Sequence, residues 1–424
     1  MRTFAEFIGW LCLCTLAYNY VGYPVLLFIL SVAYQAKSDA LYLLHRGNRR
    51  SRPISEDLPR VALLMSAYNE ESVIQAKLEN CLQIDYPVER LEFLFGLDAS
   101  TDATADVLTR FPNSRLRVLK YRTRRGKLSV LCDLAQQTSA EILVLTDANT
   151  MLDRNSIRNM VRHFVNPRIG AVSGEEVRTV ARGSDPGAES LYWRYESAIK
   201  LLESRLNVSQ GGNGAALAVR RSLFKPTRHS IVEDFQIPLD IRFNGFRVVY
   251  DPEVIAIEEI TPTFSAQFAR RVRIGAGNYQ TLFRNPRYLS PWNGLLSFSF
   301  ISHRFLRWLC PFVLLVALFC NIALATQPRF AALLALQCSF YSAALLGYAL
   351  KRRGRSTGML SLPLHFCSMN LALFLGLYAY VTGRQGATWA ATPRLGNPMQ
   401  DRAFLGTNER DTETTNAVVY RPAA

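Results

Sequence analysis

Two short acidic motifs hold residue types that can carry chemistry. Asp147 and Asn149, in TDANT, place two oxygen-bearing side chains on one face of the chain, two residues apart. Such oxygens suit a hard divalent cation, Mg²⁺ or Mn²⁺, which also binds phosphate oxygens. Glu233 and Asp234, in VEDF, are adjacent acids that open a predicted helix. Each motif alone also has a structural explanation, because Asp and Asn are common in turns and acids favour helix N-termini.

A glycine-rich segment is the third candidate feature. Gly211, Gly212 and Gly214 in SQGGNGA would let the backbone approach a substrate closely, or would simply form a tight turn. Neither a GxGxxG motif after the first predicted strand nor a GxxxxGK[ST] motif anywhere is present. Dinucleotide-binding and P-loop interpretations therefore lose their main support.

The elements that must position these residues alternate between strand and helix. Short apolar runs predict four buried parallel strands, at 61–66, 91–97, 116–119 and 141–146. A helical pattern follows each strand, at 70–83, 102–110, 127–137 and 154–164. This alternation predicts a doubly wound α/β sheet, in which ligands bind beyond the carboxyl ends of the strands. Polar side chains do lie just after the strands: Tyr68, Asn69, Glu70, Asp98 and Asp147.

The composition indicates a folded chain of more than one domain. It has 424 residues, of which 49% are apolar and 20% charged, and this argues against disorder. The net charge of +15 is compatible with a nucleic acid, an anionic membrane or a phosphorylated substrate as partner. No recognised nucleic-acid module accompanies the densest basic run, at 115–127, so we expect no nucleic-acid partner. Most of the cysteines lie in long apolar runs without a CxxC pair, which excludes a disulfide framework and a structural zinc site.

Four apolar segments are long enough to cross a bilayer, at 7–34, about 305–325, 330–350 and 359–382. The first predicts an anchor at 1–36, because it far exceeds the ~7–15 apolar residues of a signal peptide. Basic residues after this anchor and at 351–355 predict that 37–300 and the 351–355 loop are cytoplasmic. We expect the membrane to be a bacterial inner membrane. The last segment, 359–382, contains Pro363, His365 and Asn370, so it would either span or re-enter. We assign 305–383 to C-terminal membrane segments.

Two further regions have a distinct pattern. Apolar residues recur at helical spacing after residue 263, at Phe264, Phe268, Val272, Tyr279 and Phe283. This predicts interfacial amphipathic helices over 263–304, and a core-packing helix with a solvated basic face is the alternative. The tail at 384–424 is polar and aromatic-poor, which predicts a flexible segment.

In combination, the motifs resemble the membrane-bound family 2 glycosyltransferases, the group that contains cellulose, chitin, hyaluronan and poly-N-acetylglucosamine synthases. The resemblance covers roughly 58–285 and the membrane segments around it. It rests on SAYNEE at 66–71, LDASTDAT at 97–104, Gly126-Lys127, TDAN at 146–149, VEDF at 232–235 and QFARR at 267–271.

This resemblance implies a Rossmann-like, glycosyltransferase A-type domain at 37–262 and an inverting transfer from a nucleotide-sugar, with UDP as the expected nucleotide. Asp234 would be the general base with Glu233 in support, and Asp147 and Asn149 would hold Mg²⁺ or Mn²⁺. The donor would be bound by Tyr68, Glu70, Asp98, Lys127 and Asp147. The acceptor or the diphosphate would be bound by Gly212, Asn213, Gly214, Gln267, Arg270 and Arg271.

Two departures from the family pattern change the expectations. Asn149 replaces a carboxylate, which should weaken the intrinsic metal affinity. Arg271 stands where the family has a Trp that helps to form the acceptor platform of processive synthases. The acceptor therefore stays open between a growing surface polysaccharide and a lipid such as a polyprenyl phosphate or a glycolipid, and a non-catalytic membrane scaffold is a further alternative. The sugar and any partner subunit also stay open.

Overall fold

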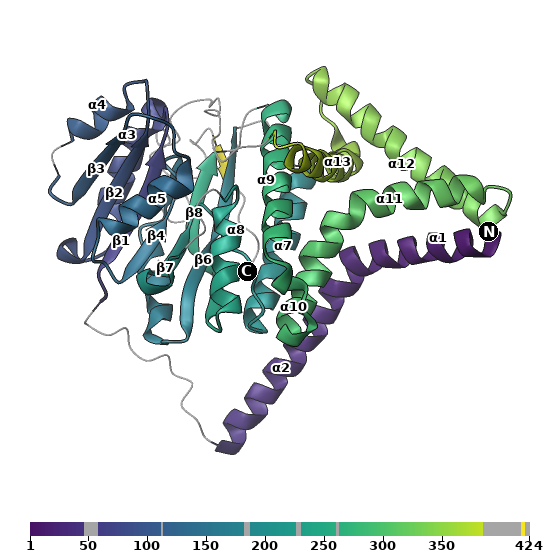
Figure 1. Ribbon diagram of the computed structural model, residues 1–424, viewed down its shortest axis with the longest axis horizontal. Helices are drawn as coiled ribbons and strands as arrows, with labels where there is room; N and C mark the ends of the chain where they lie inside the picture. Colours follow the sequence, from purple (N-terminus) through teal and green to yellow (C-terminus); the bar gives the residue numbers. More distant parts are fainter. Residues whose placement is uncertain are drawn as a thin grey trace. The chain divides into compact units, whose positions relative to one another are not determined.

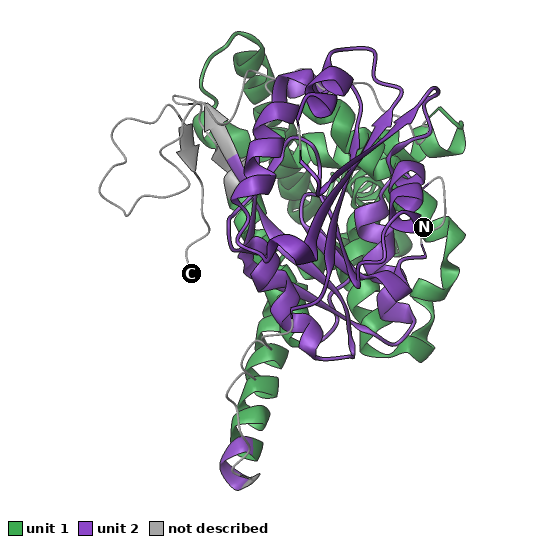
Figure 2. Cartoon of the chain, turned by 90° about the vertical axis from the view of Figure 1, so that its left-hand side faces the viewer, with its two compact units in different colours: residues 1–41, 185–206, 267–385 green, residues 42–184, 207–266, 386–424 purple. Residues whose placement is uncertain are grey.

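The computed structural model describes residues 1–45, 58–111, 113–181, 187–225, 230–259, 263–384 and 417–419. The chain forms two compact units that interleave in sequence (Figure 2). We call residues 42–184, 207–266 and 386–424 the sheet unit, and residues 1–41, 185–206 and 267–385 the helical unit. The predicted domain at 37–262 differs from the sheet unit chiefly in 185–206, which belongs to the helical unit, and by a few residues at each end, because the helical unit includes 37–41 and the sheet unit includes 263–266.

The first half of the sheet is parallel, as predicted. It contains β1 (Val61–Ala67), β2 (Leu91–Asp98), β3 (Leu116–Tyr121) and β4 (Ile142–Leu145), in the order β3-β2-β1-β4. Val61, Leu63 and Met65 of β1 join one apolar cluster, whereas Ala62 and Leu64 join the cluster on the opposite face. Burial on both faces explains why β1 is apolar throughout.

The second half of the sheet is mixed and was not predicted. Its strands are β5 (Thr150–Leu152), β6 (Ile169–Ala181), β7 (Leu217–Arg220), β8 (Arg247–Glu259) and β9 (Ala417–Val419). The order continues β4-β7-β6-β8-β5, with β7 antiparallel to both neighbours, β5 antiparallel to β8, and β9 paired with β6. Charged residues interrupt the apolar runs of β6 and β8, so neither strand shows the signal of the first four. Of the tail predicted to be flexible, Arg384 and 417–419 are described, and 417–419 is strand β9.

Helices cover both faces of this sheet (Figure 1). One apolar cluster includes residues of α3 (Glu71–Gln83), α4 (Thr104–Thr109) and α6 (Ser156–Val161), and the other includes residues of α5 (Lys127–Gln136) and α8 (Glu233–Phe243). Gly96 lets α5 lie close to β2, because a Cβ there would lie 2.2 Å from Val130 Cγ1. Short 3₁₀ turns occupy Val88–Arg90, Arg162–Val165, Arg221–Leu223, Pro286–Leu289, Pro291–Asn293 and Gly358–Leu360.

The helical unit is built from long apolar helices. It contains α1 (Arg2–Ala17), a π-helical turn at Tyr18–Gly22, most of α2 (Tyr23–His45), α7 (Gly187–Arg205), most of α9 (Phe264–Arg284), α10 (Leu295–Ser299), a π-helical turn at Phe300–Phe305, α11 (Leu306–Ala323), α12 (Pro328–Arg352) and α13 (Ser361–Val381). The chain bends between α1 and α2 at the first π-helical turn (Figure 1), as extra residues in a helical turn cause.

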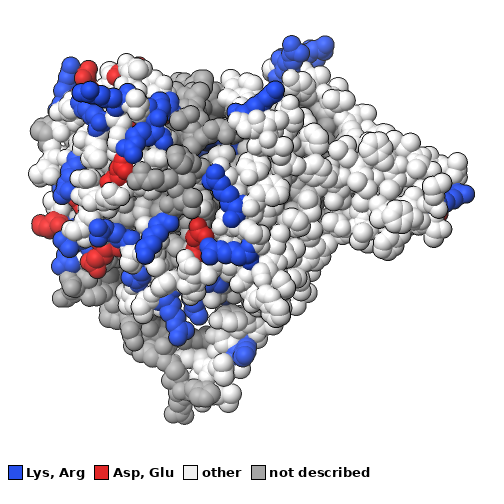
Figure 3. Space-filling view, in the orientation of Figure 1, with Lys and Arg blue, Asp and Glu red and all other residues white. Residues whose placement is uncertain are grey.

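Within the described residues, four helical segments are long and apolar enough to cross a membrane: Arg2–Leu44, Leu295–Ala323, Pro328–Arg352 and Gly358–Val381. This confirms the expected number of about four. The second segment begins at Leu295, inside the region predicted to be interfacial, and the fourth is a continuous helix despite Pro363. Figure 3 shows a surface nearly free of charged side chains over α1, α11 and α12, with Lys and Arg gathered at the ends of these helices.

Helix α9 packs against α13 through small residues. A Cβ at Gly275 would lie 3.2 Å from Ala372 O, and one at Gly376 would lie 2.8 Å from Ala276 N. Small residues allow this close approach of two helix backbones. Tyr279 donates a hydrogen bond to Trp308 O at 2.7 Å and is buried. The second half of α9 therefore packs against other helices of the helical unit.

A buried ionic network joins α7 to the start of α11 within the helical unit. His303 lies between two carboxylates, with Nδ1 2.8 Å from Glu203 Oε1 and Nε2 3.3 Å from Glu196 Oε2. Arg307 donates to Glu196 Oε1 and lies against the rings of Tyr20 and Tyr195. Burial raises the pKa of the Glu196 carboxyl, but the Arg307 charge and the His303 hydrogen bond outweigh this, so the pKa lies well below its usual range.

Replacing Glu196 by Gln should destabilise the protein, because Arg307 would keep its charge in a buried site without a counter-ion. Loss of one partner of a buried ion pair costs about 3–5 kcal/mol. Thermal unfolding of the detergent-solubilised protein measures this as a lower Tm.

The matched control is Glu6→Gln, which breaks the more exposed ion pair between Glu6 and Arg329, 3.0 Å apart. Such pairs contribute about 0–1 kcal/mol. Equal shifts in Tm for the two variants would contradict a stabilising role of the buried network.

Candidate active site

Hydrogen bonds tie together the loops that follow β1 and β2. Asn69 has a left-handed backbone (φ 54°), which Asn tolerates better than most residues. Its side-chain oxygen accepts from Thr101 N at 2.9 Å, and its own N–H donates to Ser100 Oγ at 3.2 Å. Glu70 N donates to Thr104 Oγ1 at 2.8 Å. Tyr68 and Glu70, both predicted to bind the donor, are therefore held at the same edge of the sheet as Asp98.

Asp98 organises the basic loop that precedes α5. Its fully buried carboxylate accepts hydrogen bonds from the backbone N–H groups of Arg125 at 2.6 Å and Gly126 at 3.0 Å. The guanidinium of Arg124 also donates to Asp98 Oδ2, at 3.2 Å, and lies over the ring of Tyr68. Gly126 has φ 83°, which glycine adopts readily, and this turn leads directly into Lys127. Asp98, which was predicted to bind the sugar donor, therefore holds the 124–126 loop in place by accepting hydrogen bonds from it.

Lys127 links two of the predicted motifs. Its Nζ lies 2.7 Å from Asp147 Oδ1 and 2.6 Å from Glu233 Oε1. Burial lowers the pKa of Lys127, but the two carboxylates more than offset this, so the pKa is raised above its ordinary value. A charged ammonium group therefore joins the end of β4 to the start of α8.

The glycine-rich loop lies directly against Asp234. Gly212 N donates to Asp234 O at 2.9 Å, and a Cβ at Gly214 would lie 3.3 Å from Asp234 Oδ2. Glu233 is buried, whereas Asp234 is half-buried. Of the two acids, Asp234 is therefore the one whose carboxylate reaches solvent more easily.

Asn213 in the same loop has unused hydrogen-bonding capacity. Its Oδ1 accepts from Ala215 N at 3.1 Å, and its backbone N–H donates to Ser173 Oγ at 2.9 Å. Its Nδ2 is buried and makes no hydrogen bond within the part of the chain that the structure describes. A buried amide donor without a partner is costly in a finished structure, which favours a ligand contact here.

Asp147 and Asn149 lie on the turn between β4 and β5. Asp147 is half-buried, and the Nδ2 of Asn149 donates to Glu258 Oε1 of β8 at 3.2 Å. No cluster of three or more His, Cys, Asp or Glu side chains that could hold a metal occurs in the described ranges. Two protein oxygens fit a Mg²⁺-type ion that takes its other ligands from water and a diphosphate.

Two residues that support this turn were missed in the sequence. Lys77 of α3 is fully buried and donates to the carbonyl of Thr150, and Asn80 exchanges two hydrogen bonds with the backbone of Leu152. Burial lowers the pKa of Lys77, although Cys81 and Asp147 act in the opposite direction. The sequence signal is a lysine on the apolar face of α3, in helical register with Ile74 and Cys81.

The remaining predicted residues belong to the helical unit. Gln267, Arg270 and Arg271 lie in α9, and Arg271 Nη1 donates to Ser368 Oγ of α13 at 3.3 Å. The structure thus brings the other predicted site residues together within the sheet unit and leaves these three in the other unit.

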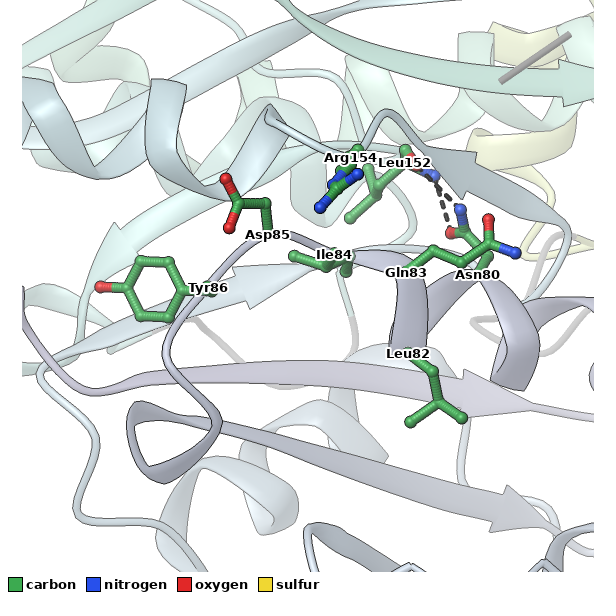
Figure 4. A pocket seen from close by; sticks show the side chains of 8 residues that line it. All are labelled: Asn80, Leu82, Gln83, Ile84, Asp85, Tyr86, Leu152 and Arg154. Atoms are coloured by element: carbon green, nitrogen blue, oxygen red, sulfur yellow. Dashed lines mark hydrogen bonds between the residues drawn. The ribbon is translucent and has the colours of Figure 1, made fainter. Parts of the chain in front are cut away.

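A cavity of about 460 Å³ lies elsewhere in the sheet unit (Figure 4). It is lined by the end of α3 and the loop after it, including Asn80 and Asp85, and by Arg154. None of the predicted site residues lines it, so we do not assign the active site there.

Comparison with known proteins decides the family. Residues 59–277, just over half of the chain, match the model of the family described as glycosyltransferase like family 2. The chain belongs to this family. The matched range of this family 2 glycosyltransferase contains the Asp147, Lys127 and Asp234 motifs, so the resemblance inferred from them is confirmed.

Two curated relatives are synthases of the same polysaccharide. The poly-β-1,6-N-acetyl-D-glucosamine synthase of Staphylococcus epidermidis is 24% identical over 232 residues, which is 53% of this chain and 56% of the relative. The synthase of the same name from Staphylococcus aureus (strain COL) is 24% identical over 239 residues, or 54% of this chain and 57% of the relative. The chain thus spans about half the length of the curated relatives it matches.

A solved structure supports the fold. The mannosyltransferase PcManGT from Pyrobaculum calidifontis, in complex with GDP-Man and Mn²⁺, has a TM-score of 0.66 and 22% identity, over 89% of this chain and 100% of that one. At this identity the likeness concerns the fold alone. It agrees with the predicted glycosyltransferase A-type α/β domain.

Replacing Asp98 by Asn should release the 124–126 loop of this family 2 glycosyltransferase. The amide nitrogen cannot accept a hydrogen bond, so one backbone N–H loses its partner and Arg124 loses its counter-ion. Hydrogen bonds to charged groups contribute about 1.5–3 kcal/mol, so exchange of the Arg125 and Gly126 amides should accelerate about 10–100-fold. Hydrogen–deuterium exchange of peptides covering 122–128 measures this.

The control is Asp106→Asn in α4, whose side chain is exposed. Unchanged exchange over 122–128 in Asp98→Asn would show that the loop is held by other contacts.

Proposed function

We propose that this chain is an inverting, metal-dependent glycosyltransferase that moves a sugar from a nucleotide-sugar to a saccharide acceptor in surface polysaccharide synthesis. UDP is the proposed nucleotide. The observation that carries the proposal is the assembly at one edge of the sheet: Lys127 joins Asp147 to Glu233, and the Gly212–Gly214 loop lies against Asp234. The polysaccharide synthases among the relatives support the product class.

The proposed chemistry is a single in-line displacement. Asp234 accepts the proton of an acceptor hydroxyl group, whose oxygen bonds to the anomeric carbon of the donor sugar. The bond from that carbon to the diphosphate oxygen breaks, and the nucleoside diphosphate leaves with the electron pair. Because attack comes from the face opposite the leaving group, the configuration inverts and an α-linked donor gives a β-linkage.

Other side chains bind and orient the two substrates. Tyr68, Glu70 and the loop held by Asp98 flank the proposed donor site, and the buried Asn213 amide supplies a hydrogen-bond donor beside the base. Lys127 adds positive charge next to Asp147, where the diphosphate would bind. Asp147 and Asn149 would hold Mg²⁺ or Mn²⁺, which when bound would offset the negative charge of the leaving diphosphate.

A lipid acceptor is the second candidate. Arg271, which replaces the Trp of processive synthases, has Ser368 of the apolar helix α13 as its partner. An arginine that is fixed against a membrane helix suits an acidic lipid headgroup better than a stacked sugar ring. This observation favours transfer of one sugar to a lipid phosphate over chain elongation, and product size separates the two.

Release of nucleoside diphosphate by the purified protein tests the proposal. The protein in nanodiscs is incubated with Mg²⁺ or Mn²⁺, a panel of UDP-sugars and GDP-mannose, and oligosaccharide and polyprenyl phosphate acceptors. We expect turnover with one UDP-sugar, and a loss of about 10²–10⁴-fold in Asp234→Asn because the general base is removed.

The matched control is Asp240→Asn on the same helix, which should keep the activity. Equal turnover by Asp234→Asn and wild type would contradict the assignment of the base. No release with any donor and acceptor by a folded protein would favour the scaffold alternative.

The sheet unit is proposed to be cytoplasmic, in an integral protein of a bacterial inner membrane. The four candidate membrane helices and the basic end of α12, at Lys351 and Arg352, support this. Alkaline phosphatase, which is active only outside the cytoplasm, should be active when fused after residue 326 and inactive when fused after residue 355. The reverse pattern would contradict the orientation.

A further inference from the structure

We propose that Glu258 is a positioning residue of the metal site, which fixes the Asn149 amide and supplies the negative charge that Asn149 lacks. The proposal rests on the proposed function, because it assigns a task to a side chain beside the proposed metal ligands. Nothing in the sequence motifs points to Glu258, since it lies in β8, between the VEDF and QFARR motifs and outside both.

The sheet brings the two side chains together. β5 runs antiparallel to β8, and their register pairs Thr150 with Glu258. This places Glu258 beside the turn that carries Asn149, and the Nδ2 of Asn149 donates to Glu258 Oε1 at 3.2 Å. Glu258 is 6% exposed, so its carboxylate is largely removed from water.

The chemistry of this pair fixes the orientation of the amide. A carboxylate oxygen accepts hydrogen bonds, and the amide presents its Nδ2 to Glu258 Oε1. The carbonyl oxygen, which is the end that a hard cation binds, is then left at the opposite end of the planar group. Within the described ranges, Oδ1 of Asn149 takes part in no hydrogen bond, so its lone pairs are available.

The charge of the site explains why such help is needed. Asp147 is the one predicted metal ligand with a full negative charge, and the Lys127 ammonium lies against its Oδ1. Asn149 contributes a neutral oxygen in place of a carboxylate. The nearby charge of Glu258 polarises the amide and makes its oxygen a stronger ligand, as a carboxylate does for a metal-bound histidine.

The strand pairing does not require this side-chain contact. Met151 and Leu152 pair with Ile257 and Ala256, and Asp153 N donates to Ile255 O at 3.0 Å. The backbone thus holds β5 on β8 by itself. A role of Glu258 in orienting Asn149 is therefore separable from a role in folding.

Binding of Mn²⁺ to the full-length protein in detergent, followed by electron paramagnetic resonance in the presence of UDP, tests the proposal. Glu258→Gln keeps the size of the side chain and an oxygen that can accept from Asn149, but removes the charge. We expect it to weaken Mn²⁺ binding about 10–100-fold, as loss of a side chain that supports a metal ligand does.

An exchanged pair separates positioning from folding. In the double variant Glu258→Gln/Asn149→Asp, the carboxylate moves to the ligand and the amide to β8, so Mn²⁺ affinity should return to within a few-fold of wild type. The matched control is Glu253→Gln on the same strand, whose side chain is 65% exposed and pairs with Arg162. It should bind Mn²⁺ as wild type does.

Three outcomes would overturn the proposal: wild-type affinity in Glu258→Gln, no recovery in the double variant, or no Mn²⁺ binding by the wild type. Release of UDP in the same preparations separates this proposal from the proposed function. If UDP release depends on Asp234 but Glu258→Gln binds Mn²⁺ as wild type does, the proposed glycosyltransferase function stands and the positioning role of Glu258 is wrong. If the wild type binds Mn²⁺ and Glu258→Gln weakens this binding as expected, but no UDP is released, the result would contradict the proposed function and leave the positioning role intact.

Discussion

The candidate site depends on one half-buried cation. Lys127 contacts Asp147 at the end of β4 and Glu233 at the start of α8, and these two acids would otherwise face each other without a counter-ion. The turn after β4 carries the proposed metal ligands, and α8 carries the proposed base. This ammonium group therefore sets the distance between the proposed metal site and the proposed base. A charge that is partly removed from water is costly unless it is paired, so the three side chains stabilise one arrangement together.

The surrounding loops serve to place this cation. Asp98 holds the backbone of residues 124–126, and Gly126 then turns the chain so that Lys127 begins α5. Hydrogen bonds of Asn69 join the loop after β1 to the loop after β2. Lys77 of α3 donates a hydrogen bond to the carbonyl of Thr150, at the end of the turn after β4. The carboxyl ends of neighbouring parallel strands meet at one edge of a sheet, so local contacts are enough to gather residues that are distant in sequence.

The parallel half of the fold could be predicted because β1 to β4 are continuous apolar runs, each followed by a helical pattern. The mixed half could not, since β6 and β8 carry charged residues along their length. The candidate site residues of the sheet unit lie in short motifs, but their pairing was not predictable, because contact between Lys127 and Glu233 depends on the strand order. Glu258 belongs to no motif and becomes visible only through the register of β5 on β8. The membrane helices were predictable from hydropathy. The burial of Glu196 and Glu203 was not, because acidic residues on a helix of mixed polarity are normally expected to be exposed to solvent.

A double-mutant cycle on Lys127 and Glu233 tests the central claim most directly. The value of kcat/KM for nucleoside diphosphate release is measured for wild type, Lys127→Met, Glu233→Gln and the double variant. If the ion pair acts as a unit, the second substitution adds little to the effect of the first. The loss of transition-state stabilisation in the double variant is then smaller than the sum of the losses in the two single variants, by more than about 1 kcal/mol. Losses that add to within about 0.5 kcal/mol would show that Lys127 and Glu233 act independently, and would contradict the account.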